Sequence, residues 1–73
     1  MKEYITTGVI RGEERKLLVL HPMEGLYRVY WDAHFLGTIE PITHYVFGLY
    51  WDTDSAILED CCQELGEYIE SCT

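Results

Sequence analysis

Apolar and polar residues alternate over much of the N-terminal part of this chain, as they do in strands that bury one face. Val, Ile, Thr, Tyr and Trp gather in short segments, and Gly, Pro, Asp and Glu interrupt them, which is typical of strands joined by turns. The pattern predicts five strands, at residues 4–10, 16–20, 26–31, 35–39 and 43–51. Turns are expected at 11–15, 21–25 and 32–34, and the fifth strand is expected after Glu40 and Pro41.

The C-terminal segment has the period of a helix instead. At roughly 100° per residue, its apolar side chains fall within one arc of about 140°, and carboxylates fill most of the other side. The apolar set is Ile57, Leu58, Cys61, Cys62, Leu65, Tyr68, Ile69 and Cys72. We therefore predict an amphipathic helix over about residues 55–72, and the candidate N-caps are Asp52, Thr53, Asp54 and Ser55.

These elements predict one small α+β domain over residues 1–73. An antiparallel sheet of four to five strands, over about 4–51, would be followed by the C-terminal amphipathic helix packed on one face. Leu58, Cys61, Leu65 and Ile69 are expected to make that contact. Gly66 falls near the edge of the polar side, where only a mild cost in helix propensity is expected.

The tripeptide Tyr-Trp-Asp occurs twice, at residues 30–32 and 50–52. Aromatic residues favour strands and Asp favours turns and caps, so two strand endings explain the repeat without any functional site. At the first copy we expect a three-residue loop, 32–34. That loop would pair Trp31 with Phe35, Val29 with Gly37 and Tyr27 with Ile39, whereas a two-residue loop would pair Trp31 with His34.

Small size and three cysteines bear on stability and compartment. A chain of 73 residues buries only about 60% of its unfolded surface, so a lone monomer is marginally stable. Cys61, Cys62 and Cys72 are an odd number and two are adjacent, which favours reduced thiols that act as small hydrophobes. No signal peptide and no apolar run of about 20 residues is apparent, and we expect a cytoplasmic protein that does not span a membrane.

The charge is distributed unevenly along the chain. Residues 1–28 carry five bases and four acids, a sum of +1, and residues 29–73 carry nine acids and no base, which gives the net charge of −8. Such a field opposes nonspecific binding to nucleic acid or to an anionic membrane. The simplest interpretation is a solvated acidic surface. An alternative is that the acidic helix imitates nucleic acid and binds a nucleic-acid-binding protein.

No residue pattern in the chain is typical of a catalytic or metal site. The histidines, His21, His34 and His44, and the cysteines lack the spacing of zinc ligands. Asp52 and Asp54 begin like a calcium loop, but Ile57 stands where that loop needs glycine. Carboxylates near the cysteines disfavour a reactive thiolate. We therefore predict no catalytic, cofactor-binding or metal-ligating residue, and an enzyme is the least favoured class.

A surplus of apolar residues points to a small acidic protein-interaction or assembly module. One helix can cover one face of the sheet, and the strands supply apolar residues to both. The uncovered set, and so the predicted partner-binding residues, is Leu26, Tyr30, Leu36, Val46 and Tyr50. A homodimer or a protein partner is expected there. The competing account is that the N-terminal hairpin folds back over this face and makes it ordinary core.

Overall fold

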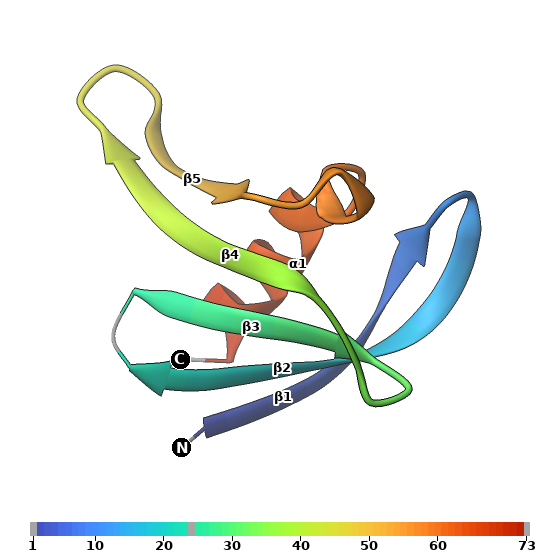
Figure 1. Ribbon diagram of the computed structural model, residues 1–73. Helices are drawn as coiled ribbons and strands as arrows, with labels where there is room; N and C mark the ends of the chain where they lie inside the picture. Colours follow the sequence, from blue (N-terminus) through green and yellow to red (C-terminus); the bar gives the residue numbers. More distant parts are fainter. Residues whose placement is uncertain (1, 24, 73) are drawn as a thin grey trace.

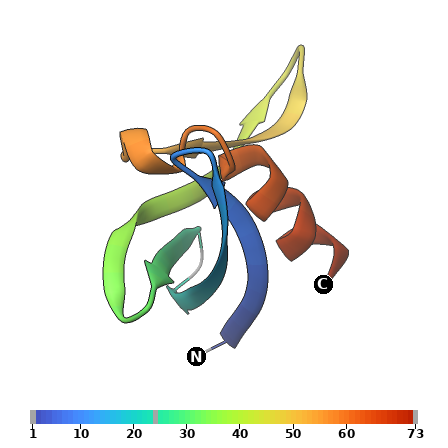
Figure 2. The same ribbon diagram turned by 90° about the vertical axis from the view of Figure 1, so that its right-hand side faces the viewer.

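The fold is a curled five-stranded antiparallel sheet with one C-terminal helix packed against it, as the sequence predicts (Figure 1). The computed structural model describes residues 2–23 and 25–72. The elements are β1 (Lys2–Ile10), β2 (Glu13–Met23), β3 (Leu26–Trp31), β4 (His34–His44), β5 (Gly48–Thr53), the 3-10 helix η1 (Ala56–Leu58) and α1 (Cys62–Ser71). The strands are adjacent in sequence order, and α1 lies on one side of the sheet (Figure 2).

The core lies between α1 and the sheet face that it covers, called here the inner face. Alternate residues of the strands point into it, so every second side chain is removed from water. The most fully buried side chains are Leu17, Val19, Val29, Ile39, Leu58, Cys61, Leu65 and Ile69. The predicted contact through Leu58, Cys61, Leu65 and Ile69 is therefore confirmed. The predicted core residues Tyr68 and Cys72 are exposed instead.

The helix is shorter than predicted, because residues 55–61 do not continue it. Successive N–H groups of this segment bond three residues back, as in the bond from Leu58 N to the Ser55 carbonyl at 3.1 Å. η1 packs on β4, and α1 packs on β5, β1 and β4. The N-cap of α1 is Cys61, which makes no side-chain capping bond, so none of the predicted caps at 52–55 caps α1. Ser55 is instead the N-cap of η1, also without a side-chain bond.

Several strand boundaries also differ from the prediction. β4 continues past Pro41 to His44, and residues 45–47 form the turn to β5, so the predicted strand 43–51 contains a hairpin turn. Pro41 is accepted in the sheet because the last pair between β3 and β4 is Tyr27 with Ile39. No β3 residue pairs with Pro41, so the missing N–H of proline leaves no carbonyl of β3 without a hydrogen-bond donor. β2 likewise begins at Glu13, inside the predicted turn at 11–15, and runs on to Met23, into the predicted loop at 21–25.

The hairpin between β3 and β4 combines features of both predicted loops. Its turn has two residues, Asp32 and Ala33, both with positive φ (49° and 67°), the backbone that matches the twist of the strands. Trp31 therefore pairs with His34, which contradicts the three-residue loop. A bulge then shifts the register, and Val29 pairs with Gly37 as predicted. The first Tyr-Trp-Asp does end a strand, whereas β5 continues beyond the second copy to Thr53.

Trp51 is the residue that joins the sheet to the helix. Its indole is 7% exposed and packs edge-on against the Tyr27 ring at 5.2 Å. Gly66 of α1 lies directly over it, and a Cβ on Gly66 would stand 2.0 Å from the Trp51 Cγ. Indole Nε1 also donates a hydrogen bond to Glu70 at 2.8 Å. Glycine is therefore required here for a close approach, not merely accepted at the helix edge.

We expect Gly66→Ala to destabilise the fold by about 1–3 kcal/mol, the usual cost of overpacking, because the new methyl overlaps the indole. Helix propensity alone predicts the opposite sign, a gain of about 1 kcal/mol. Chemical denaturation measures the difference. Glu64→Ala, at an exposed position of the same helix, is the matched control and should change the free energy of unfolding by less than about 0.5 kcal/mol. A more stable Gly66→Ala protein would contradict the Trp51 contact.

Candidate interaction surface

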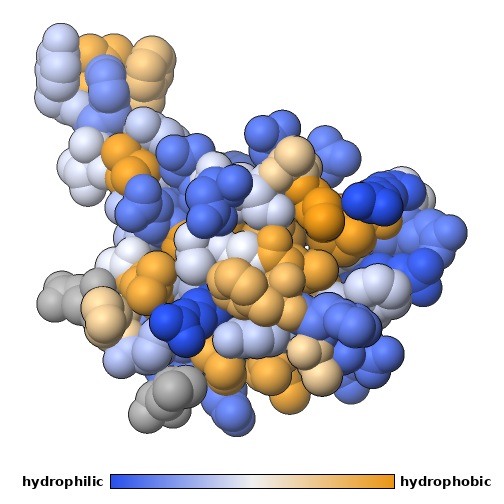
Figure 3. Space-filling model, in the orientation of Figure 1, coloured by the Kyte–Doolittle hydropathy of each residue, from blue (hydrophilic) through white to orange (hydrophobic). Residues whose placement is uncertain are grey.

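The sheet face opposite α1, called here the outer face, carries a row of apolar side chains across four strands. Ile5 pairs with Leu18, Leu18 with Tyr30, and Tyr30 with Phe35. The Tyr30 and Phe35 rings are in contact, with centroids 5.4 Å apart. Ile5 and Phe35 are 58% and 56% exposed, so the row is open to solvent. Figure 3 shows apolar side chains gathered at the centre of this face.

Two shallow hollows flank Tyr30 on the outer face. The larger is about 390 Å³ and is lined by Ile5, Lys16, Leu17, Leu18, Tyr30, Trp31, Asp32 and Ala33. The smaller is about 250 Å³ and is lined by Leu26, Arg28, Tyr30, Phe35 and Thr38. A basic side chain therefore lines each hollow, Lys16 the larger one and Arg28 the smaller one. In addition, the Arg15 guanidinium lies 4.9 Å from the centroid of the Trp31 ring. Arg15 is also ion-paired with Glu13, and the smaller hollow shares Thr38 with a hollow lined by Glu40, Asp52 and Asp54. Bases and acids therefore both border the outer row.

The structure brings together only part of the predicted partner-binding set. Leu26 and Tyr30 line the same hollow. Tyr50, 37% exposed, pairs with Ile42 far along β4 from Tyr30. Leu36 packs against the core, because it is the extra residue of the bulge, and its assignment to the uncovered face is wrong. Val46 lies in a turn, not on a strand.

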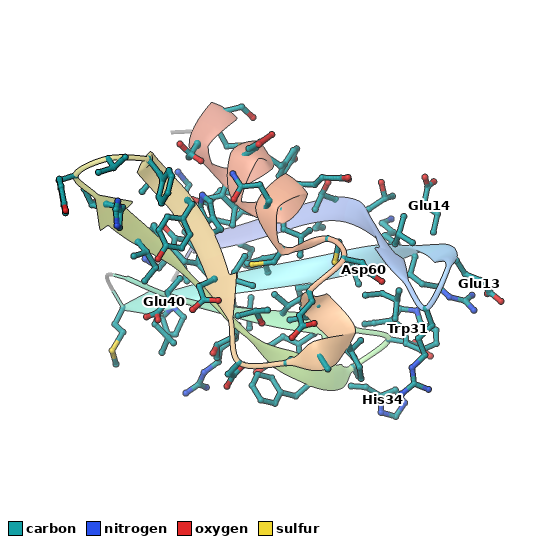
Figure 4. All side chains as sticks on the ribbon, turned by 90° about the horizontal axis from the view of Figure 1, so that it is seen from above. Glu13, Glu14, Trp31, His34, Glu40 and Asp60 are labelled. Atoms are coloured by element: carbon teal, nitrogen blue, oxygen red, sulfur yellow. The ribbon has the colours of Figure 1, made fainter. Side chains whose placement is uncertain are left out.

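The β1–β2 hairpin extends the sheet as its edge and does not fold over the outer face. The competing account of that surface is therefore wrong. The hairpin turn, with Glu13 and Glu14, lies at the same end of the sheet as Trp31 and His34, whereas Glu40 lies away from it, towards the β4–β5 hairpin (Figure 4).

A second apolar surface lies on the projecting turn between β4 and β5, which sequence reasoning assigned to a strand. Tyr45, Val46 and Phe47 are 96%, 63% and 77% exposed, and Leu49 follows them at 45%. We call these four residues the tip. The tip stands apart from the body of the molecule (Figures 1 and 3). In the sequence, Gly48 was the one residue here that is typical of a turn, and its φ in the structure is 79°.

His44 organises the backbone of the tip. Its Nδ1 accepts hydrogen bonds from the N–H groups of Val46 and Phe47, at 3.1 and 3.3 Å. Its ring also lies against the Tyr45 and Phe47 rings, with centroids 5.0 and 4.7 Å away. An acceptor Nδ1 requires the proton of the neutral ring to be on Nε2. His44 thus holds the turn that carries these exposed apolar side chains.

β4 and β5 carry acidic residues at the end of their hairpin that lies away from the tip. Glu40 and Asp52 are directly opposite each other, and both line a hollow of about 290 Å³ together with Asp54. Asp54 also accepts a hydrogen bond from the Thr38 N–H at 3.1 Å. Like charges in opposite positions destabilise a sheet. Beyond them, residues 41–51 carry no Asp, Glu, Lys or Arg, so the apolar tip is separated from this charge by neutral chain.

Two of the three free cysteines are buried. Burial, with the Glu64 carboxylate second, raises the pKa of Cys61; burial, with Asp52 second, raises that of Cys62 to about 11. Both thiols are therefore protonated at neutral pH. The histidines lie at separate places on β2 and β4, and within residues 2–23 and 25–72 no group of three or more His, Cys, Asp or Glu residues could hold a metal ion.

Comparison with known proteins identifies no relative: no protein-family model, curated protein or solved structure matches this chain. The helices of the described residues include none that is long and apolar enough to cross a membrane.

Alkylation should separate the three thiols. At pH 8, iodoacetamide should label Cys72 quickly and leave Cys61 and Cys62 unmodified until the protein unfolds, because the reactive species is the exposed thiolate. Mass spectrometry of intact protein counts the labels. The Cys72→Ala variant should lose the rapidly added label. Equal labelling rates at all three positions in folded protein would contradict the buried placement.

The role of His44 can be measured at two amides. His44→Phe keeps an aromatic ring for Tyr45 and Phe47 to contact but removes the acceptor, so the N–H groups of Val46 and Phe47 should exchange with solvent severalfold faster. Hydrogen exchange followed by NMR gives both rates. Thr43→Ala, one residue away, is the control and should leave them unchanged. Unaltered exchange in His44→Phe would show that the imidazole does not hold the turn.

Proposed function

We propose that this protein is a small non-catalytic interaction module that associates through its outer face, in the first place with a second copy of itself. The observation that carries the proposal is the apolar row Ile5–Leu18–Tyr30–Phe35, which α1 does not cover. A sheet face that stays in water normally carries polar residues. A contiguous apolar surface with aromatic members and a polar rim is typical of protein contacts.

Small size supports the same proposal. A domain of 73 residues has a limited core, and association stabilises the folded form by mass action. The three free thiols support a reducing compartment, and we propose the cytoplasm.

Exposed carboxylates support a second candidate function, an acidic inhibitor or nucleic-acid mimic. Those around α1 are Glu59, Asp60, Glu64, Glu67 and Glu70, all exposed. A protein of this kind would displace duplex DNA from a basic DNA-binding protein in a competition assay, and the displacement would persist when the outer face is changed. The outer-face proposal predicts no displacement.

Sedimentation equilibrium over about 5–300 µM tests the main proposal. We expect the average mass of the parent protein to rise with concentration. Phe35→Glu should raise the dissociation constant at least about tenfold, since it places a charge in the centre of the contact. Phe35 is half exposed in the single copy, so its loss should cost little folding stability.

Ala56→Glu is the matched control, because it adds the same charge at an exposed position of η1, away from the apolar row. It should associate like the parent. A parent protein that stays monomeric at every concentration, or a Phe35→Glu variant that associates as the parent does, would contradict the proposal.

A further inference from the structure

We infer that His44 makes the turn of the tip sensitive to acid: the turn is closed while the imidazole is neutral and is released when the imidazole is protonated. Both side-chain hydrogen bonds that the described residues give this turn end on one atom, the Nδ1 of His44, which accepts from the N–H groups of Val46 and Phe47. Histidine is the side chain that ordinarily changes charge between about pH 5 and pH 8. The inference concerns a single molecule and does not depend on the proposed self-association.

Protonation removes the acceptor completely. A neutral imidazole has one donor and one acceptor nitrogen, whereas both nitrogens of an imidazolium are donors. Neither a change of tautomer nor a rotation of the ring restores an acceptor for the Val46 and Phe47 N–H groups. A proton on Nδ1 would also point at the hydrogens of these two groups, which lie 3.1 and 3.3 Å away by their nitrogen atoms. The closed turn and the protonated His44 ring therefore exclude each other.

The aromatic contacts of His44 do not oppose this release. Its ring is stacked on the Tyr45 ring with an interplanar angle of 13°, and it lies against the Phe47 ring at a centroid distance of 4.7 Å. A cation is attracted to the face of an aromatic ring, so protonation leaves these ring contacts favourable while it removes the backbone bonds. Acid should therefore free the two amides without driving the imidazole away from its aromatic neighbours.

The hairpin around His44 carries no charge that would stabilise the protonated ring in place. Residues 41–51 contain no Asp, Glu, Lys or Arg. The other titratable groups of this segment are the phenols of Tyr45 and Tyr50, and phenols are ordinarily neutral between pH 5 and pH 8. His44 is thus the residue of the hairpin end whose charge changes in this range.

The carboxylates on the neighbouring elements are also engaged elsewhere or set back from the turn. Glu40 and Asp52 are opposite each other, four residues before His44 on β4. On α1, which packs on β5, Glu70 accepts the hydrogen bond of the Trp51 indole. Within residues 2–23 and 25–72, no ion pair involves His44. Release of the turn is therefore the way in which the structure accommodates the added proton.

The consequence falls on the most exposed apolar side chains of the described residues. Tyr45 and Phe47 are 96% and 77% exposed on a turn that projects from the body of the molecule (Figure 1). At neutral pH the two bonds to His44 keep this turn in one conformation. In acid the tip would keep the same side chains but lose their fixed arrangement, while the core under α1 stays as it is.

Amide hydrogen exchange followed by NMR between about pH 8 and pH 5 tests the inference. Each rate is divided by the rate of the same amide in an unfolded chain, because the chemistry of exchange itself depends on pH. We expect the protection of the Val46 and Phe47 amides to fall about threefold to tenfold in acid, as the loss of about one hydrogen bond requires. The fall should follow the titration of the His44 ring, and amides of β2 and β3 should keep their protection.

His44→Asn is the most informative variant. The side-chain oxygen of asparagine accepts a backbone N–H two residues further on, as in an Asx-turn, and gains no proton in this range. This variant should keep the turn protected in acid as well as at neutral pH, whereas His44→Phe should leave both amides unprotected throughout. His34→Asn, at the other end of β4, is the matched control and should respond to pH like the parent.

Equal protection of Val46 and Phe47 at both ends of the pH range in the parent would overturn the inference. A fall that His44→Asn shares with the parent would also overturn it, because another titrating group would then be responsible. Circular dichroism over the same range gives the third criterion. Loss of the whole fold in acid would contradict a change that is confined to the turn, and an unchanged spectrum is the expected result.

Discussion

The close contact between the Trp51 indole and the Gly66 backbone is the constraint on which the rest of this structure depends. It sets the distance between α1 and β5, because the indole fills the space that any Cβ on Gly66 would occupy. Once α1 is held there, its apolar residues Leu65 and Ile69 fall over the inner face and are almost completely buried. The indole N–H bond to Glu70 fixes the rotation of the ring as well.

The same placement lets α1 protect both edges of an open sheet. Edge strands carry unpaired backbone groups that invite aggregation. On β5, the Trp51 N–H donates to the Gln63 side-chain oxygen at 3.1 Å, and on β1 the Ile5 carbonyl accepts from the Tyr68 hydroxyl at 3.2 Å. Tyr68 is exposed because it reaches to the edge of the sheet instead of into the core. With its edges partly covered in this way, the sheet is left with the outer face and the tip as its open apolar surfaces.

Sequence periodicity predicted the fold class because burial and secondary structure repeat together. The bounds of β3 match the expected 26–31, and the apolar stripe of α1 indicated its buried residues. Gly66 could not be understood this way, since helix propensity describes a residue alone and the indole comes from a distant strand. The bulge at Leu36 was missed for a similar reason: nothing local to residues 35–37 determines which residue is left unpaired.

The residues that the sequence prediction placed most wrongly also form the main surface that it missed. Binary patterns treat apolar residues as buried, so Tyr45, Val46 and Phe47 were interpreted as part of a strand over 43–51, and only Val46 of the three was predicted to bind a partner. In the structure they are exposed at the tip, held by His44.

The most direct measurement of the central claim is the concentration dependence of two-dimensional NMR spectra of the parent protein, from about 10 to 500 µM. The account predicts progressive changes at the residues of the outer row, with α1 unaffected. Spectra that do not change with concentration, or changes confined to α1, would contradict it.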